Sequence, residues 1–382
     1  MKTIQTKEEF DQFVEDFFTT HAKPYAFAIG NAFRDDDGNI VAVRWLKVNI
    51  ETSYGFFASC INCMAPVPDF SGPTLLSVSG RTAQNILDRA LHPFRGESGH
   101  DNMTVLSSVR DVNNERDGVM IVYPNKEYLT DKAPVSSADV LCRLTMISTL
   151  HFQPRVLNLD GAFGLLNRLY YTEDGAMTEA QWKKQFLLGK VVQPISVDKF
   201  PPMWWGAPIP EGVRIADLSR VRLGAHLAPG TTVMHAGFVN FNAGTLGASM
   251  VEGRISASVI VGNDSDIGGG ASIMGTLSGG GKEVITIGKN CLLGANSGTG
   301  ISLGDRCTVE AGLYVKSGML IKVASLRFEG LETQSIPGQE GMWIKAEKLS
   351  GKSDMLFIRN SVTGSVELRW NKKPNKLNPD LH

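Results

Sequence analysis

Residues 215–251 read IADLSRVRLGAHLAPGTTVMHAGFVNFNAGTLGASMV, and every sixth residue of this stretch is aliphatic or, once, a threonine. These positions are Ile215, Val221, Leu227, Val233, Val239, Thr245 and Val251. An amphipathic helix needs apolar spacings of three and four, and a strand needs a spacing of two, so a period of six fits neither. A fixed period of six is typical of a parallel β-helix, in which three hexapeptides make one triangular coil. This stretch therefore predicts a prism of stacked coils with its aliphatic side chains pointing inward.

The same period resumes three times further along the chain, at Val261–Ile273, Ile287–Leu293 and Leu303–Ile321. The residue after the aliphatic is often glycine, which relieves crowding where a coil turns a corner. The breaks at 256–260, 276–286 and 295–302 are expected to be extra residues looped out of the coils. Such loops usually carry the functional residues of a repeat scaffold.

The flanking regions predict two further domains. Residues 1–202 alternate helical and strand patterns, with a helix starting after Thr6, a hairpin turn at Asp35–Gly38 and helices at 81–90 and 137–149. Residues 324–382 lose the period and read as short strands at 325–329, 342–348, 355–359 and 366–370, with a solvated tail at 371–376. We therefore predict a mixed α+β N-terminal domain over 1–202, a β-helix over 203–323 and a small β C-terminal domain with a tail over 324–382.

Composition narrows the class of protein. The 38 basic and 39 acidic residues give a net charge of −1, which offers no general attraction for nucleic acid or an anionic membrane. The charged N-terminus does not resemble a signal peptide, and no apolar run is long enough to span a membrane. The five cysteines are an odd set that favours reduced thiols, so a cytoplasmic location is expected. Cys60 and Cys63 have metal or redox spacing but no second pair, and the flanking residues 55–59 resemble a buried strand more than a zinc knuckle.

Several residues are candidates for chemistry. Glycine-rich 278–282 lacks the first glycine of a phosphate-binding loop, so it is interpreted as a flexible insertion. His226 and His235 lie in the coils, but zinc would need a third histidine there; His235 is a candidate general base, and a packed coil histidine is the alternative. Glu252 follows an inward-facing valine at a position that is usually small. Spacing alone leaves two interpretations of it open, an acid–base group or a surface partner of Arg254.

At these positions the sequence resembles the tetrahydrodipicolinate N-succinyltransferases. The shared motifs are MHAGFVN at 234–240, MVEGRIS at 250–256, IGGGASIMG at 267–275, GANSG at 294–298, VEAGLYV at 309–315 and RNS at 359–361. The resemblance covers about residues 200–361, and the first two hundred residues contribute little to it.

The resemblance implies a left-handed β-helix acyltransferase that moves a succinyl group from succinyl-CoA to the amine of tetrahydrodipicolinate. The product would be N-succinyl-2-amino-6-oxopimelate, in diaminopimelate and lysine biosynthesis. It also implies a homotrimer with active sites between neighbouring β-helices, and succinyl-CoA as a co-substrate with no other cofactor.

By motif position, Glu252 matches the family's catalytic carboxylate. The succinyl-CoA contacts that the resemblance implies are Arg254, Gly269, Ser272, Ala295, Glu310, Ala311, Gly318, Lys345, Ile358, Arg359, Asn360 and Ser361. Ile358 stands where an arginine is expected. Some members bind magnesium on the trimer axis through acidic residues where this chain has Ser219 and Ala236, so we predict no metal there.

General chemistry suggests roles for some of these residues. Arg254 suits a carboxylate, and Lys345 and Arg359 suit the phosphates of coenzyme A. Backbone N–H groups at Gly268–Gly270 or Gly275 could bind the oxyanion that develops during thioester aminolysis. Two other functions stay open: an acyltransferase that uses acetyl-CoA on an amino sugar or amino acid, and a β-helix scaffold without catalysis.

Overall fold

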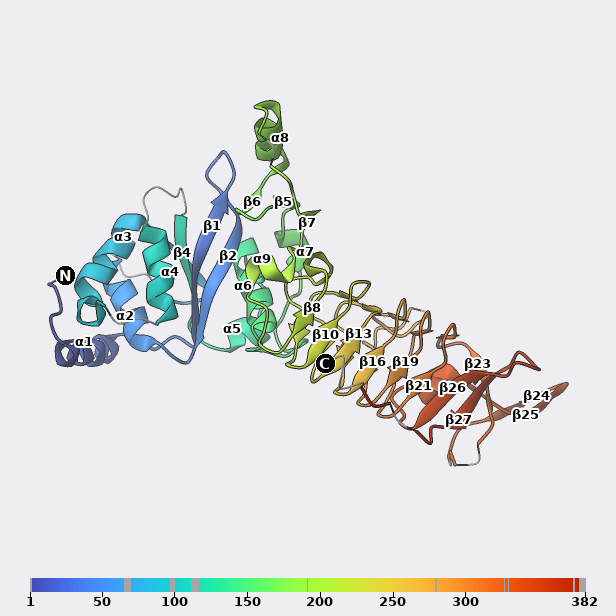
Figure 1. Cartoon of the computed structure of the whole chain (residues 1–382). Helices are drawn as coiled ribbons and strands as arrows, with labels where there is room; N and C mark the ends of the chain where they lie inside the picture. The colour runs from blue at the N-terminus through green and yellow to red at the C-terminus, as the bar shows by residue number, and fades with distance from the viewer. Residues whose placement is uncertain are drawn as a thin grey trace. The chain divides into compact units, whose positions relative to one another are not determined.

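The computed structural model describes residues 2–64, 70–96, 100–110, 117–190, 192–278, 280–325, 327–328, 330–373 and 375–377. The chain forms two compact units (Figure 1). The first unit comprises Met1–Met146, Val156–Pro201 and Trp205–Ala207, and the second comprises Ile147–Arg155, Pro202–Trp204 and Pro208–His382. No helix in the described part of the chain is long and apolar enough to cross a membrane.

The first unit is built on an antiparallel four-stranded sheet in the order β2-β1-β4-β3. Its strands are β1 (Ala26–Arg34), β2 (Ile40–Ile50), β3 (Thr74–Val78) and β4 (Asp117–Tyr123). The predicted hairpin is confirmed, because β1 pairs with β2 across the turn at Asp35–Gly38. A second sheet has the order β6-β5-β7, from β5 (Leu169–Tyr171), β6 (Ala176–Met177) and β7 (Ser196–Asp198).

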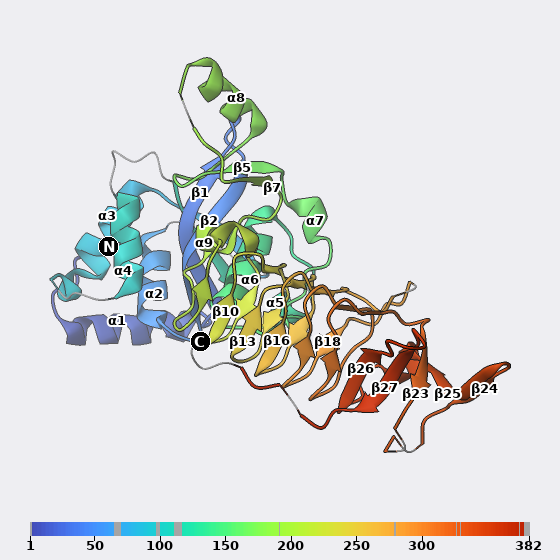
Figure 2. The same cartoon turned by 45° about the vertical axis from the view of Figure 1, so that its right-hand side comes forward.

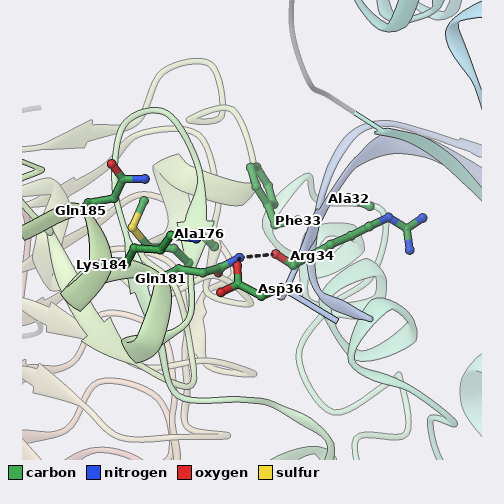
Figure 3. Close-up of a pocket in the computed structure, with 9 residues that line it drawn as sticks. Ala32, Phe33, Arg34, Asp36, Ala176, Gln181, Lys184 and Gln185 are labelled. Carbon is green, nitrogen blue, oxygen red and sulfur yellow. Dashed lines mark hydrogen bonds between the residues drawn. The ribbon is translucent and has the colours of Figure 1, made fainter. Parts of the chain in front are cut away.

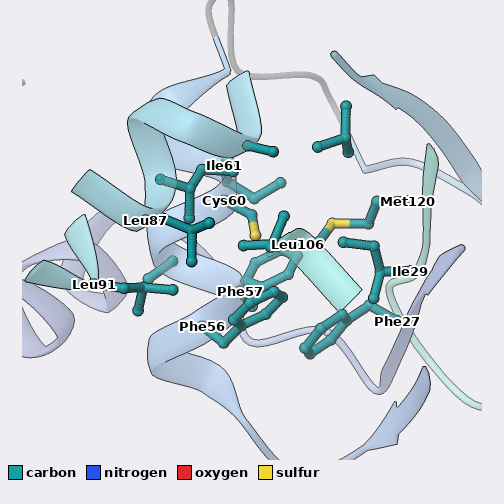
Figure 4. Packing of buried hydrophobic residues seen from close by; sticks show 14 of the residues in the cluster. Phe27, Ile29, Phe56, Phe57, Cys60, Ile61, Leu87, Leu91, Leu106 and Met120 are labelled. Atoms are coloured by element: carbon teal, nitrogen blue, oxygen red, sulfur yellow. The ribbon is translucent and has the colours of Figure 1, made fainter. Parts of the chain in front are cut away.

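Four helices supply apolar side chains to the core on the four-stranded sheet (Figure 4). They are α1 (Lys7–Thr20), α2 (Tyr54–Cys63), α3 (Gly80–Asn85), which continues as a π-helix over Ile86–Ala90, and α4 (Asp101–Arg110). The predicted helix start is confirmed, because the Thr6 hydroxyl accepts the Glu9 N–H at 3.2 Å. The predicted strand at 55–59 is wrong. These residues belong to α2, whose positions 56–61 are all buried, and burial on every side removes the periodicity that separates a helix from a strand.

The other helices in the described part of the chain are short, apart from α6 and α8. They are a 3₁₀ helix at His92–Phe94, α5 (Glu127–Thr130), α6 (Ser137–Ser148), α7 (Ala162–Leu165), α8 (Glu179–Leu187), α9 (Met203–Gly206) and 3₁₀ helices at Leu218–Arg220 and Ala346–Leu349. The α6 helix confirms the prediction at 137–149 and carries a fully buried ion pair, Arg143 Nε to Asp139 Oδ1 at 2.7 Å. The Arg143 guanidinium also donates to the carbonyls of Tyr128, Leu129, Lys132 and Asn158.

The second unit is a parallel β-helix with three faces, and its successive coils run from β10 to β26 (Figures 1 and 2). The first face contains β8 (Arg214–Ile215), β10 (Thr231–Val233), β13 (Ser249–Val251), β16 (Ser265–Ile267), β19 (Leu292–Leu293), β21 (Thr308–Val309) and β26 (Met355–Arg359). The second face contains β11 (Phe238–Val239), β14 (Arg254–Ile255), β17 (Ser272–Ile273), β20 (Gly298–Thr299) and β22 (Tyr314–Val315). The third face contains β9 (His226–Leu227), β12 (Gly244–Thr245), β15 (Ile260–Val261) and β18 (Thr286–Ile287).

The inward positions predicted from the period of six are confirmed. Every one of them from Val221 to Ile321 is at most 2% exposed. Along the first face, Val233, Val251, Ile267, Leu293 and Val309 stack in register on neighbouring coils. Only Ile215, at the start of the series, is half-buried, so the period marks the core of the prism.

Two of the three expected loops are wrong. The register steps from Val251 on the first face to Ile255 on the second, and from Thr299 on the second to Leu303 on the third, so two corners have four-residue steps instead of six. Residues 256–260 and 295–302 are therefore part of the coils. The segment 276–286 is a real insertion, because Ile273 and Ile287 are fourteen residues apart, eight more than one regular step.

The strands after residue 323 extend the first face. β26 pairs in parallel with β21, β27 (Val366–Trp370) pairs antiparallel with β26, and β27 adjoins β23 (Leu320–Val323). β25 (Gln339–Lys345) joins β23 to β24 (Gln334–Ile336). The predicted strands at 355–359 and 366–370 are confirmed, and that at 342–348 is confirmed in its first half. The strand expected at 325–329 is wrong for the residues described there, because Ser325, Arg327 and Phe328 lie between β23 and β24 and belong to no strand. The predicted solvated tail at 371–376 is wrong at its first residue, because Asn371 is buried and its amide donates to the Arg306 carbonyl at 2.8 Å. Leu326, Glu329 and Pro374 lie outside the described residues. The three-domain division stays a prediction.

Candidate active site

Most of the predicted site residues lie at one corner of the prism, where the first face turns into the second. We call this edge the site corner; its turns are 234–237, 252–253, 268–270, 294–296 and 310–312, and at the last coil the end of strand β26, 358–359, takes the place of a turn. Backbone hydrogen bonds join successive turns, from Asn296 N–H to the Gly269 carbonyl at 2.8 Å and from Gly312 N–H to the Ala295 carbonyl at 2.9 Å. The coil register therefore aligns residues that are far apart in the sequence into one column.

Glu252 occupies the shortened turn of the site corner. Its N–H donates to the Ile267 carbonyl at 2.8 Å, so the backbone is fixed by the next coil. A Cβ built on Gly269 would lie 3.2 Å from Glu252 Oε2, which places the carboxylate directly beside that glycine. Glu252 and Arg254, both described residues, form no ion pair with each other, so the interpretation of Glu252 as a surface partner of Arg254 is wrong.

A groove of about 530 Å³ lies on the second face beside the site corner. Arg254 and Ser272 line it on neighbouring strands, and Phe238 and Tyr314 belong to the same outward-facing column. The insertion contributes Thr276, Leu277, Ser278 and Gly280 to its lining. A Cβ on Gly298 would lie 2.3 Å from the Tyr314 ring, so the aromatic ring can lie across the face only because this position is glycine. The groove thus combines an exposed guanidinium with aromatic and hydroxyl groups.

Glu310 and Arg359 are brought together at the distal end of the site corner. Glu310 Oε2 accepts the Arg359 N–H at 2.7 Å, and Arg359 Nη1 donates to the Gly364 carbonyl at 3.2 Å. Asn360 Oδ1 accepts the N–H groups of Val362 and Thr363, which closes the turn between β26 and β27. Glu310 therefore holds the turn that carries Arg359, Asn360 and the exposed Ser361.

Asn360 also acts on the following strand. Its side-chain amide donates to Glu367 Oε1 at 2.7 Å, and this hydrogen bond, followed by Arg369, lowers the pKa of Glu367. Ile358, the departure from the family pattern, is half-buried on β26.

Gly318 and Lys345 lie together at the end of the coils. The residues around them pair through the backbone, with Ala346 N–H donating to the Met319 carbonyl and Glu347 N–H to the Ser317 carbonyl, each at 2.9 Å. Lys345 is exposed, with its Nζ 3.8 Å from Glu347. Nothing lies within 4 Å of a Cβ built on Gly318, so this backbone is open to a ligand.

The two coil histidines differ in environment. His226 is buried, its Nδ1–H donates to the Thr245 carbonyl at 2.9 Å, and burial lowers its pKa. These contacts match a packed coil histidine. His235 is 87% exposed in the first turn of the site corner, with Nδ1 4.0 Å from Asp217 Oδ2, and it stays a second candidate base.

Ser219 and Ala236, at the position where some family members are expected to bind magnesium, are engaged in hydrogen bonds within the chain. The Ser219 hydroxyl donates to Asp217 Oδ1 at 2.6 Å, a contact that lowers the pKa of Asp217, and the Ala236 carbonyl accepts from Arg220 Nη2 at 3.1 Å. Within the described residues, no three His, Cys, Asp or Glu side chains gather as a metal site. The absence of a metal on a trimer axis stays a prediction.

Two features of the first unit involve none of these residues. Cys60 and Cys63 are free thiols on α2, and burial raises the pKa of each. A cavity of about 360 Å³ lies between the β1–β2 hairpin and α8 (Figure 3). There the Gln181 amide donates to the Arg34 carbonyl at 2.8 Å, while the Arg34 side chain points away from Gln181, Lys184 and Gln185. This cavity contains none of the residues that the sequence predicts for the site.

Comparison with known proteins agrees with the coil architecture. Residues 284–317 match the model of the hexapeptide repeat of succinyl-transferase. Together with the site corner, this match defines the protein as a hexapeptide-repeat acyltransferase with a left-handed β-helix. Residues 8–164 match the N-terminal domain model of tetrahydrodipicolinate N-succinyltransferase.

Relatives that match two thirds of the chain carry the same family name. Proteins named 2,3,4,5-tetrahydropyridine-2,6-dicarboxylate N-succinyltransferase from Vibrio cholerae and Pseudomonas aeruginosa are 53% and 49% identical, each over 66% of this chain and 72% and 71% of their own length. A crystal structure from Campylobacter jejuni, provisionally assigned as a 2,3,4,5-tetrahydropyridine-2-carboxylate N-succinyltransferase, is 33% identical. It covers 97% of this chain and 99% of that chain with a TM-score of 0.84. The chain belongs to the tetrahydrodipicolinate N-succinyltransferase family.

Two parts of this picture were missed from the sequence. The family relationship extends over 8–164, a region whose helices and strands carry no motif of recognisable chemistry. Phe238 and Tyr314 were not selected because the period of six marks inward residues, and both lie one position before an inward valine. The signal that could have found them is the outward position compared from coil to coil, which places both in one column with Arg254.

Proposed function

We propose that this protein transfers the succinyl group of succinyl-CoA to the amine derived from tetrahydrodipicolinate. Water opens the cyclic imine, the new amide is N-succinyl-2-amino-6-oxopimelate, and coenzyme A is released. The observation that carries this function is the 53% identity to the Vibrio cholerae protein of that name. The reaction belongs to diaminopimelate and lysine biosynthesis.

Glu252 is the proposed catalytic carboxylate. Thioester aminolysis needs a base for the proton that the amine loses, and a carboxylate two residues before Arg254, which lines the groove, can accept it. The N–H groups of Gly268 and Gly270 already donate to the carbonyls of Leu293 and Glu252. Among the three glycines, this leaves the Gly269 N–H as the candidate donor to the oxyanion. A covalent route, with Glu252 acylated before the amine attacks, uses the same residue as a nucleophile.

The donor would lie along the site corner and the groove. Arg254 makes no ion pair with a described residue, and its guanidinium matches the geometry of the distal succinyl carboxylate. Arg359 and Lys345 are exposed cations farther along the coils and suit the phosphates of coenzyme A. Gly269, Ser272, Ala295, Ala311 and Gly318 supply small side chains or open backbone against which an extended chain can pack. Ile358, Asn360 and Ser361 would frame the phosphate end.

The active protein is proposed to be a cytoplasmic homotrimer with no cofactor besides its co-substrate. The β-helix presents flat faces, and cyclic packing of such faces creates clefts that two chains share. Light scattering at micromolar concentration should give three times the mass of one chain. A monomer that turns over succinyl-CoA at the full rate would contradict the shared-site arrangement.

The direct test is release of coenzyme A thiol in the presence of tetrahydrodipicolinate. We expect saturable turnover with succinyl-CoA and a much lower kcat/KM with acetyl-CoA. Equal efficiency with both donors would indicate a less selective acyltransferase. Absence of turnover combined with absence of succinyl-CoA binding would indicate a scaffold instead.

A further inference from the structure

The insertion at 276–286 is folded back on itself. Thr276 pairs antiparallel with Val284, and the Leu277 N–H donates to the Glu283 carbonyl at 2.8 Å. The Ile285 N–H closes the base of the insertion by donating to the Gly275 carbonyl at 3.2 Å. These bonds shape the insertion internally, but they do not fix its position over the second face.

A pair of serines fixes that position. The Ser317 N–H donates to Ser278 Oγ at 2.7 Å, the Ser278 hydroxyl donates to Ser317 Oγ at 3.0 Å, and the Ser317 hydroxyl donates to the Ser278 carbonyl. Each hydroxyl thus donates one hydrogen bond and accepts one, so the polar groups of the pair satisfy each other. Ser317 is buried, and thirty-nine residues separate it from Ser278.

The coil beneath the pair is shaped for this contact. Ser278 N–H donates to the Gly300 carbonyl at 2.9 Å. A Cβ on Gly300 would lie 2.6 Å from Ser278 Oγ and 2.9 Å from Met274 Sδ, so a larger residue would push the insertion away. Gly300 lies in the four-residue step between the second and third faces.

The serine pair connects three parts of the candidate site. Ser278 lines the groove that contains Arg254 and Ser272. Ser317 immediately precedes Gly318, and its carbonyl accepts the N–H of Glu347, two residues after Lys345. Movement at this one contact would therefore shift a groove wall and the two C-terminal site residues together.

We propose that Ser278 and Ser317 are positioning residues that hold the insertion in place to keep the acyl-donor groove formed. This inference rests on the proposed function, since the donor is taken to be succinyl-CoA. Without the pair, the insertion leaves the second face more often, and the donor must restore its position on binding. The loss should appear as weaker donor binding, with the chemical step at Glu252 little changed.

The test uses the full-length enzyme with Ser317→Ala, Ser278→Ala and the double variant. We expect KM for succinyl-CoA, and Kd for coenzyme A by calorimetry, to rise about five- to thirty-fold, the equivalent of one or two neutral hydrogen bonds. We expect kcat to stay within about threefold, since uniform binding is what is lost. The double variant should be no worse than the worse single variant, because both remove the same contact. Unlike Ser278→Ala, the conservative variant Ser278→Thr keeps the hydroxyl and should have the wild-type KM.

Trypsin cleavage after the exposed Lys282 measures the position of the insertion independently of catalysis. The alanine variants should be cleaved there about five- to thirty-fold faster, and coenzyme A should slow the cleavage. Ser265→Ala is the matched control, because its buried hydroxyl donates to the Gly288 carbonyl at 2.8 Å on a different corner of the prism. It should lower the stability of the coil without changing KM or cleavage after Lys282.

Unchanged KM and unchanged cleavage in an active enzyme would overturn the proposal, and so would a fall in kcat at constant KM. If Ser317→Ala fails to fold, the half-buried Ser278→Ala decides the question alone. An inactive wild-type protein that does not bind succinyl-CoA would instead refute the proposed function, whatever the cleavage rates are.

Discussion

Replacing Glu252 by glutamine removes the charge of the proposed catalytic carboxylate and almost nothing else. The two backbone groups of this residue that hydrogen-bond to the next coil, its N–H to the Ile267 carbonyl and its carbonyl to the Gly270 N–H, are unaffected. Because the carboxylate has no ion pair with Arg254, its removal leaves no charge unpaired there. We therefore expect a change in the free energy of unfolding within about 0.5 kcal/mol.

The effect on turnover should be much larger. A positioned acid–base group contributes about 10²- to 10⁴-fold, or about 2.7–5.4 kcal/mol of transition-state stabilisation. Succinyl-CoA affinity should change little, because the missing interaction belongs to the transition state. Gly269→Ala offers a graded comparison. Its new Cβ would lie 3.2 Å from Oε2, so the carboxylate must shift by a few tenths of an ångström, and turnover should fall only about three- to tenfold.

The assay is thiol release with tetrahydrodipicolinate, with donor affinity measured separately by calorimetry. Incubation with labelled succinyl-CoA alone distinguishes the two routes, because only the covalent route transfers the label to the enzyme without the amine. Nearly full activity in Glu252→Gln would refute the assignment, and His235, in the first turn of the same corner, would become the leading base.

Three further predictions follow from the contacts described above. Arg254→Leu should reduce the preference for succinyl-CoA over acetyl-CoA, which is measured as the ratio of kcat/KM for the two donors. In the wild-type protein acetyl-CoA leaves the Arg254 cation unpaired, which costs about 2–4 kcal/mol. Arg143→Leu should lower the free energy of unfolding by about 3–5 kcal/mol in urea titrations, because Asp139 and four backbone carbonyls lose their buried partner. Burial lowers the pKa of His226 below its ordinary 6.5, so the unfolded chain binds a proton that the folded chain resists; stability should fall as the pH drops below about 6.5, and less steeply in His226→Gln.

The sequence was most informative at positions that have the same buried environment in coil after coil. Val221, Leu227 and Val233 all point into the prism, so their uniform spacing of six residues is enough to predict the β-helix. Ile255 and Thr299 were not recognised as inward residues because a step of four interrupts the count, and the regular residues that follow then resemble a loop. In α2, apolar side chains on every side gave no period at all. Glu252 could be selected from the sequence because it stands at a corner position that is usually occupied by a small residue. Its closeness to Gly269 could not be predicted, because it depends on how neighbouring coils align.

The serine pair could not be predicted in this way. Ser278 and Ser317 are common residues in polar turns, and nothing within either turn indicates a partner thirty-nine residues away. Their contact depends on the length of the insertion, on the four-residue step at Gly300 and on the alignment of two coils. These are properties of the assembled prism, and a single hexapeptide does not contain them.

The stacking of the coils also fixes the distances between the residues that are proposed to contact the acyl donor. Neighbouring coils are one sheet spacing apart, about 4.8 Å, and four such spacings separate the turn of Glu252 from the end of β26 at Arg359, about 19 Å in total. Because backbone hydrogen bonds between coils fix this spacing, the distances between residues on successive turns of the site corner cannot change by less than one coil. Evolution could match a longer or shorter acyl donor only by adding or deleting a whole coil, or by moving a contact residue to a neighbouring turn. Smaller changes in the fit to the donor would have to come from the length of the side chain at each turn.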